Sequence, residues 1–233
     1  MNQDHDIMLK MEDINKSFGE VQVLKNINFQ VGYGQCCGLI GENGSGKSTL
    51  MKILTGVYKK EADGKIYFRG NILDPGKYVD ITKAGIAMVH QEVNIFPYLS
   101  VAENMFLGHL PQKMGMIDWK NLYRMAGEQL ELMGVENLDI RKPLGEYGAG
   151  IQQIVVIARA LLVDSRLLVL DEPTSSLDEE EIEILFRVLR RLLKQKISII
   201  YISHKLDELF EICDKVYVIR DGKNIADYEI DQV

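Results

Sequence analysis

A nine-residue run that combines glycines, a lysine and two hydroxyl side chains is the part of this sequence best suited to chemistry. The run is Gly41-Glu42-Asn43-Gly44-Ser45-Gly46-Lys47-Ser48-Thr49, and it matches the pattern G-x-x-x-x-G-K-[S/T] of phosphate-binding loops. Glycines let the backbone curl so that its N–H groups converge on phosphate oxygens. In such loops the lysine reaches the β- and γ-phosphates and the next hydroxyl binds Mg²⁺. We expect these roles for Lys47 and Ser48.

Two adjacent acids supply the second half of a candidate site. Asp171 and Glu172 follow the apolar run 167–170, which is too short for a helix and predicts a buried strand. A carboxylate at the end of such a strand faces the crevice beyond the sheet, where α/β folds bind ligands. We expect Asp171 to hold the metal, through water or with Ser48, and Glu172 to polarise an attacking water. Taken alone, an acidic pair at a strand end is often only a solvated surface.

The elements around these residues predict an α/β fold. The loop lies between the apolar stretch 36–40 and the helix-like stretch 50–54, which is the strand–loop–helix context that the motif needs. Early strands without intervening helices favour an antiparallel sheet near the N-terminus, whereas later helix–strand alternation predicts a mostly parallel sheet with right-handed crossovers. Apolar patterns place strands at 8–14, 22–31, 65–69, 86–89, 197–202, 215–219 and 223–227, and helices at 119–133, 150–162 and 179–194.

The chain is predicted to form one folding unit, residues 1–233, with a mostly helical insertion at about 92–163. Its 233 residues are 46% hydrophobic, which is enough for one sizeable core, and they contain no repeat or proline-rich linker. Within the expected helix 179–194, Asp178 can cap the N-terminus and Glu181 completes a capping-box pattern.

Composition also limits the partners. The net charge of −7 gives no strong basic field, so we expect no nucleic-acid partner. The three cysteines form no metal-binding spacing and are expected to be small core residues in a reducing cytoplasm. No apolar run approaches the roughly 20 residues that span a bilayer, and the acidic residues 1–6 do not resemble a signal peptide. A membrane role would therefore be indirect.

In order and spacing, the motifs resemble the ATP-binding-cassette family of ATPases over nearly the whole chain. Gln91 resembles the glutamine of the family's Q-loop, Asp178 the aspartate of its D-loop, and His204 its switch histidine. The match is strongest to the amino-terminal cassette of ATPase subunits that serve bacterial importers of the ribose, galactose and xylose type. The runs that carry it are 14–19, 41–44, 50–58, 90–92 and 171–177.

The resemblance implies a RecA-like P-loop NTPase core that binds ATP and Mg²⁺. It implies that Phe18 stacks on adenine with Val23 beside it, and that Ser48, Gln91 and Asp171 hold the metal. The catalytic residues implied are Lys47, Glu172 and His204, with the histidine contacting the γ-phosphate.

The implied partners are transmembrane permease subunits, a second cassette and, indirectly, a periplasmic or extracellular solute-binding protein. These partners would place the chain on the cytoplasmic face of the cell membrane as a peripheral subunit. In the family, the apolar and aromatic region 93–108 receives the permease, although most of its side chains would belong to the core of the insertion.

One motif departs from the family pattern. The signature L-S-G-G-Q falls at residues 147–151, where Gly148 replaces the serine and Ile151 the glutamine, while Gly150 remains. In the family, that serine hydroxyl binds the γ-phosphate held by the opposing cassette, and glycine has no hydroxyl to donate. We therefore expect an asymmetric pair of cassettes and low ATPase activity for this chain alone.

Three other functions remain open at this point. A non-transport cassette ATPase would usually carry long insertions or basic arms. A module that senses ATP without hydrolysing it would fit the altered signature. A small P-loop kinase would leave Gln91, Asp178 and His204 unexplained.

Overall fold

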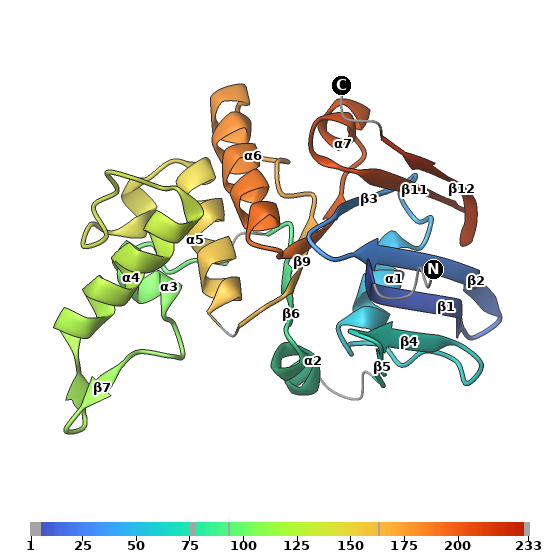
Figure 1. The fold of residues 1–233 in the computed structure, drawn as a ribbon, viewed down its shortest axis with the longest axis horizontal. Coiled ribbons are helices and arrows are strands. Elements are labelled where there is room, and N and C mark those ends of the chain that lie inside the picture. Colours follow the sequence, from blue (N-terminus) through green and yellow to red (C-terminus); the bar gives the residue numbers. More distant parts are fainter. Residues whose placement is uncertain (1–5, 75–77, 93, 163, 231–233) are drawn as a thin grey trace.

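A six-stranded sheet holds the two motifs at its strand ends (Figure 1). The computed structural model describes residues 6–74, 78–92, 94–162 and 164–230. Val93, Val163 and residues 1–5, which the sequence analysis included in the insertion and the N-terminal stretch, lie outside the described residues. The strand order is β12-β11-β3-β10-β9-β6, parallel throughout except for β12. The strands are β3 (Cys36–Ile40), β6 (Ile86–Val89), β9 (Leu167–Asp171), β10 (Ser198–Ile202), β11 (Lys215–Arg220) and β12 (Lys223–Glu229).

The inner strands of this sheet are buried on both faces, which explains their continuous apolar sequences. Along β9, Leu168 and Leu170 face a cluster formed with the helices, while Leu167 and Val169 face the antiparallel sheet. Helix α1 (Lys47–Leu54) packs on that second side. All three cysteines are buried and free, as expected for small core residues.

The antiparallel sheet is confirmed near the N-terminus. Its first strand is longer than expected, whereas the second agrees with the expected 22–31 to within one residue at each end. Its order is β2-β1-β4-β5, with β1 at Ile7–Phe18 and β2 at Val21–Gly32. The register of this pair shifts several times, and Asp13 and Asn26 adopt positive φ angles of 50°. Bulges of this kind break the alternation of side chains. The alternating apolar pattern of β1 in the sequence therefore ends before the strand does. The shorter strands are β4 (Lys65–Phe68) and β5 (Asn71–Ile72).

The segment between β6 and β9 contributes helices that lie beside the large sheet (Figure 1). Helix α4 matches its predicted bounds, and its buried residues Leu122, Ala126, Leu130 and Met133 follow helical spacing. The expectation of a mostly helical stretch is correct only in part, because a hairpin and an irregular segment at 134–148 interrupt it. The elements are α3 (Val101–Met105), β7 (Gln112–Lys113), β8 (Met116–Ile117), α4 (Trp119–Met133), η2 (Leu144–Glu146) and α5 (Ala149–Leu161).

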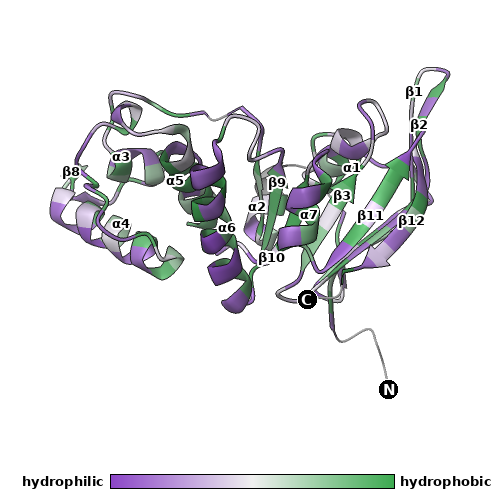
Figure 2. Cartoon of the chain, turned by 90° about the horizontal axis from the view of Figure 1, so that it is seen from above, coloured by the Kyte–Doolittle hydropathy of each residue, from purple (hydrophilic) through white to green (hydrophobic). Residues whose placement is uncertain are grey.

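Helix α6 (Glu179–Lys194) covers the helical side of the sheet together with α5, and its predicted capping box is present. Figure 2 shows α5 as largely hydrophobic and α6 as mixed, as expected of a helix with one buried face. Helices α2 (Tyr78–Ala84) and α7 (Leu206–Ile212) were not predicted, because two turns are too short for a periodic pattern. Among the described residues, no helix is both long and apolar enough to cross a bilayer.

Candidate nucleotide-binding site

A pocket of about 500 Å³ opens where the glycine-rich loop meets the ends of β6 and β9. Segments far apart in the sequence line it together, which is the arrangement that the two motifs predict. The lining residues are Phe18, Val23, Asn43, Gly44, Ser45, Gly46, Lys47, Ser48, Thr49, Gln91, Asp171 and Glu172.

The loop has the close-packed geometry of an anion cradle. Gly46 is the N-cap of α1 with φ 108°, a backbone conformation that favours glycine. A Cβ atom on Gly41 would lie 2.1 Å from the carbonyl oxygen of Ile219, so the backbone passes where a side chain cannot fit. The N-terminus of α1 directs its unpaired N–H groups and positive partial charge toward the pocket.

Lys47 places its ammonium group beneath the loop. Its Nζ atom donates to the carbonyl oxygens of Gly41 at 2.6 Å and Glu42 at 3.1 Å. Burial lowers the pKa of Lys47, and the charges of Glu172 and Asp171 oppose that shift. The pKa of Asp171 is raised by burial and by Glu172, while His90, Lys47 and Lys52 act in the opposite direction. An added cation would relieve the repulsion between the two carboxylates.

Three polar residues that follow neighbouring strands meet above the sheet. Gln91 follows β6, Glu172 follows β9 and His204 follows β10. The Nδ1 atom of His204 lies 3.2 Å from Oε1 of Glu172, and Gln91 donates from Nε2 to Oε2 at 3.3 Å. Carboxyl ends of parallel strands meet at one edge of the sheet, so the topology brings these side chains together. Glu172 has a φ of 46°, a left-handed conformation that is uncommon for this residue type.

Phe18 forms one wall of the pocket at the end of β1. Its side chain is 44% exposed, and its ring meets Tyr58 edge-on with centroids 5.1 Å apart. The ammonium of Lys16 lies 5.2 Å from the centroid of the Phe18 ring. An exposed aromatic face beside a phosphate cradle suits a planar base, and Val23 lines the same wall.

Six predicted site residues do not line this pocket. Gly41 and Glu42 directly precede its loop and His204 contacts Glu172, whereas the other three lie elsewhere. Asp178 caps α6 by accepting from the N–H of Glu181 at 2.9 Å, and neither it nor Gly148 nor Gly150 lines the pocket. The N–H of Gly150, near the start of α5, donates to Oε1 of Glu181 at 2.9 Å. A Cβ atom on Gly148 would lie 2.6 Å from that same oxygen. A carboxylate of the chain thus occupies the place beside the altered signature.

The oxygen donors at the pocket fit a hard cation that is shared with a ligand. No group of three or more His, Cys, Asp and Glu side chains among the described residues could hold a metal alone. Ser48, Gln91 and Asp171 nevertheless line one pocket with a hydroxyl, an amide and a carboxylate. Mg²⁺ in nucleotide sites takes few protein ligands and completes its shell with phosphate oxygens and water.

Three sets of contacts in and near this site are not marked in the sequence. Glu181 next to the signature and the buried Glu208 behind Glu172 both act across elements. The capping-box pattern pointed to Glu181 only as a local helix signal, and nothing in the sequence marks Glu208 as buried. The aromatic contact of Tyr58 with Phe18 likewise joins residues that no local pattern connects.

Comparisons with known proteins agree with this geometry. The profile of the ABC transporter family matches residues 24–175. The ribose import ATP-binding protein RbsA of Caldanaerobacter subterraneus subsp. tengcongensis is 46% identical over 97% of this chain and 45% of its own length. The xylose import ATP-binding protein XylG of Pseudomonas fluorescens is 44% identical over 95% of this chain and 43% of its own length. The chain therefore spans a little less than half of these curated relatives.

Solved structures show the same fold. The ADP conformation of MJ1267, an ATP-binding cassette of an ABC transporter, superposes with a TM-score of 0.83 at 27% identity, covering 96% of this chain and 91% of that one. The protein cbiO1 from Clostridium perfringens, part of the ABC transporter complex cbiONQ, gives a TM-score of 0.84 at 28% identity, covering 96% of this chain and 89% of that one. Because the family profile covers more than half of the chain and the solved cassettes match nearly all of it, the chain belongs to the ABC transporter family.

Proposed function

We propose that this chain binds ATP with Mg²⁺ and hydrolyses it, as one nucleotide-binding domain of a bacterial ABC importer for a sugar. The observation that carries the proposal is the single pocket lined by the loop 43–49, the Phe18 wall and the carboxylates at the end of β9. The names of the ribose and xylose import relatives favour a sugar. Under this proposal residues 1–233 form one domain, with a helical insertion at about 92–163.

Binding would use each wall of the pocket differently. Phe18 stacks on adenine beside Val23, and the N–H groups of the loop cradle the phosphates. Lys47 turns its ammonium from the loop carbonyls toward the β- and γ-phosphates, exchanging one set of acceptors for a charged one. Ser48, Gln91 and Asp171 would hold Mg²⁺, which would supply positive charge near the phosphates.

Hydrolysis would depend on the residues above the sheet. Glu172 accepts a hydrogen bond from a water and orients it in line with the γ-phosphate. His204, 3.2 Å from the Glu172 carboxylate, donates to the γ-phosphate in the transition state. Catalysis of this kind consists of positioning and charge stabilisation rather than covalent chemistry.

A second cassette would complete the site, and the pair would be asymmetric. Cassettes of this family pair head to tail, so the altered signature of this chain faces the partner's nucleotide. At that signature Gly148 stands in place of a serine, so the serine hydroxyl is missing. The Glu181 carboxylate accepts a hydrogen bond from the N–H of Gly150 there. A fixed negative charge beside a helix N-terminus weakens its attraction for a phosphate. The Lys47 pocket of this chain would then be the productive one.

Permease contact would occur through exposed aromatic residues of the insertion. In the region 93–108, Phe106 is buried, whereas Phe96 is 52% exposed and Tyr98 is 94% exposed. The exposed pair forms the candidate contact surface, and the chain would lie at the cytoplasmic face of the membrane as a peripheral subunit. A solute-binding protein would act only through the permease, and no nucleic-acid partner is proposed.

The proposal is tested by separating ATP binding from hydrolysis. Replacing Lys47 with Ala should weaken ATP binding at least about 10-fold, because a charge-assisted contact to phosphate contributes roughly 1.5–3 kcal/mol. Replacing Glu172 with Gln should leave affinity nearly unchanged and slow hydrolysis by about 10²-fold or more. Calorimetric titration and phosphate release measure the two quantities.

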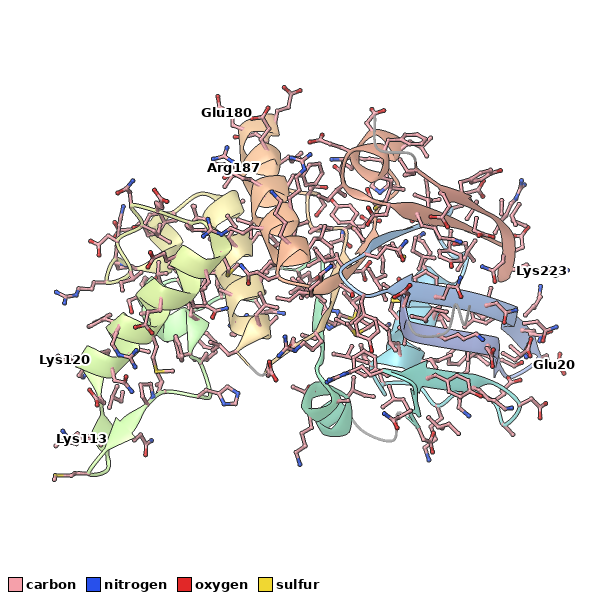
Figure 3. All side chains as sticks on the ribbon, in the orientation of Figure 1. Glu20, Lys113, Lys120, Glu180, Arg187 and Lys223 are labelled. Atoms are coloured by element: carbon pink, nitrogen blue, oxygen red, sulfur yellow. The ribbon has the colours of Figure 1, made fainter. Side chains whose placement is uncertain are left out.

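Lys120→Ala is the control for the loss of a positive charge as such, because Lys120 is an exposed lysine on α4. Figure 3 shows it at one end of the molecule, with Lys223 at the other end. Unchanged ATP affinity in the Lys47 variant would contradict the loop assignment. Undiminished turnover in the Glu172 variant would remove that residue from catalysis.

One specific observation keeps a second function open. Because Glu181 occupies the α5 terminus, the chain could serve as a cassette that binds ATP and regulates its partner without rapid hydrolysis. That function predicts tight ATP binding with no turnover, even when a second cassette is supplied.

A further inference from the structure

A buried carboxylate lies behind the candidate site without lining the pocket. Glu208 on α7 is only 6% exposed, and charged groups are rarely buried unless they are fully hydrogen-bonded. Oγ1 of Thr174 lies 2.7 and 2.8 Å from its two carboxylate oxygens. Tyr201 and Ser203 donate hydroxyl bonds to Oε2 at 2.9 and 3.1 Å, and Nζ of Lys205 lies 2.9 Å from Oε1.

The partners of Glu208 come from the two turns that carry the reactive side chains. Thr174 is two residues after Glu172, in the turn that follows β9. Ser203 immediately precedes His204, in the turn that follows β10. One carboxylate therefore joins the backbone segments that set the positions of Glu172 and His204.

This role differs from ordinary helix capping. Glu208 is at the third position of α7, where a capping-box glutamate would bond back to the N–H of the N-cap, Lys205. That N–H instead donates to Oγ of Ser203 at 3.0 Å, and the Lys205 side chain does not cap the helix backbone. The carboxylate is directed at side chains rather than at the helix backbone, and Thr174, Tyr201 and Ser203 among them lie outside α7.

Electrostatics support a charged carboxylate at this place. Burial raises the pKa of Glu208, but hydrogen bonds from Thr174, Lys205 and Tyr201 together lower it by more than burial raises it. The pKa of Glu208 therefore lies below its ordinary value. Burial and the Glu208 charge both raise the pKa of Tyr201, which keeps its hydroxyl a donor. A charged acceptor makes stronger hydrogen bonds than a neutral one, so the two turns are held firmly.

We propose that Glu208 is a positioning residue for ATP hydrolysis: by bonding both Thr174 and Ser203, it keeps the Glu172 carboxylate and the His204 imidazole in register. The inference rests on the proposed hydrolytic function. Glu172 needs such support because its backbone adopts a left-handed conformation. His204 needs it because its side chain is 59% exposed and has little packing of its own.

The test compares two hydroxyl deletions at the same carboxylate. Thr174→Val removes a bond that ties the Glu172 turn, whereas Tyr201→Phe removes a bond from the interior of β10, outside both turns. If the role were only structural, both variants would lose similar thermal stability and similar activity. We expect similar stability losses, but a fall of about 10-fold or more in hydrolysis for Thr174→Val alone, because small misplacements of reacting groups slow reactions strongly.

Glu208 variants test the carboxylate itself. Glu208→Leu should slow hydrolysis by about 10²-fold, while Glu208→Gln should recover much of that loss, because an amide can bridge two hydroxyls. The dissociation constant for ATP should change less than about 3-fold in all variants, since lost positioning lowers turnover rather than ground-state binding. Single-turnover assays with the 233-residue chain in excess over ATP measure even slow hydrolysis.

Hydrogen exchange provides a readout that does not need hydrolysis. Backbone amides of Glu172, Thr174 and Ser175 and those at 203–205 should exchange faster together in Thr174→Val, and not in Tyr201→Phe. If the unmodified chain does not hydrolyse ATP even when a second cassette is supplied, the proposed function fails, while this exchange pattern still tests the coupling of the turns. If the unmodified chain hydrolyses ATP but Thr174→Val matches Tyr201→Phe in turnover and exchange, the positioning role of Glu208 is wrong.

Discussion

At the scale of single residues, the site holds side chains whose charges are unfavourable without a ligand. Asp171 is partly buried beside Glu172, and Lys47 is buried against backbone carbonyls rather than paired with either acid. Such an arrangement costs stability in the empty chain and is relieved when a cation and phosphates enter. At these positions, the side chains that favour ligand binding therefore lower the stability of the ligand-free chain.

Asp171→Asn should stabilise the nucleotide-free chain at pH 7 and weaken its Mg²⁺-dependent ATP binding. Burial and Glu172 raise the pKa of Asp171 in the folded chain. The folded state therefore binds the proton more tightly than the unfolded state, and the stability from this group falls as pH rises above about 3.9. The asparagine variant avoids that loss, so its melting temperature should exceed that of the parent by more at pH 7 than at pH 4.

The matched control is Asp74→Asn, an exposed carboxylate outside the pocket, which should show no such pH-dependent difference. A lower melting temperature for Asp171→Asn at pH 7 would show that the carboxylate is stabilising, contrary to this account.

Phe18→Ala should weaken ATP binding through the base and leave phosphate binding intact. Base–aromatic stacking contributes about 1–3 kcal/mol on truncation, so ATP affinity should fall by about 5- to 150-fold. Inorganic tripolyphosphate, which lacks a base, should bind equally well to both proteins. The control is Tyr228→Ala, another exposed aromatic residue, on β12. Equal losses for ATP and tripolyphosphate would mean that Phe18 supports the loop instead of the adenine.

At the scale of elements, the sequence predicted those whose patterns are local and long. Helices α4 and α6 matched their predicted bounds because amphipathic spacing and caps mark them. The end of the bulged β1, the short α7 and the hairpin β7–β8 were not predicted, because bulges, brief helices and two-residue strands lack such patterns. For the site, residue types predicted the pocket, but contacts such as Glu181 with Gly150 depend on how two helices pack.

The packing of α5 against α6 makes Gly148 and Glu181 energetically coupled. In the present chain, Gly148→Ser should destabilise, because its Cβ would lie 2.6 Å from Oε1 of Glu181 and displace a carboxylate bonded to Gly150. In a Glu181→Ala background the same serine should be neutral or stabilising, since serine is a favoured N-cap. The double-mutant cycle should give a coupling of about 0.5–3 kcal/mol in denaturant unfolding.

Gly127→Ser on α4 is the matched control, since a Cβ there meets nothing within 4 Å. It should show no coupling to Glu181. Additive effects of Gly148→Ser and Glu181→Ala would mean that the carboxylate moves aside without cost.

At the scale of the whole molecule, the chain carries one pocket lined by both motifs and, apart from it, the glycine run that we interpret as an altered signature. It spans 45% of the RbsA relative that it matches, which leaves room in such proteins for a second cassette. The pocket at Lys47 lies between the loop and the β9 end, whereas Gly148 lies at the start of α5, outside that pocket. The two features would therefore serve different nucleotides in a head-to-tail pair.

This separation predicts that two copies of the chain make a poor ATPase. A symmetric pair would join two intact loops to two signatures that lack the serine hydroxyl. Removing one hydrogen-bond donor that stabilises charge developing in the transition state typically slows a reaction by about 10²- to 10³-fold. Phosphate release by the chain alone should be slow and proportional to its concentration. Adding a second cassette with an intact signature should raise turnover by about 10²-fold, and a Glu172→Gln chain in the same mixture should abolish most of that gain. Rapid hydrolysis by the chain alone, rising with the square of its concentration, would show instead that Gly148 and Glu181 leave the signature functional.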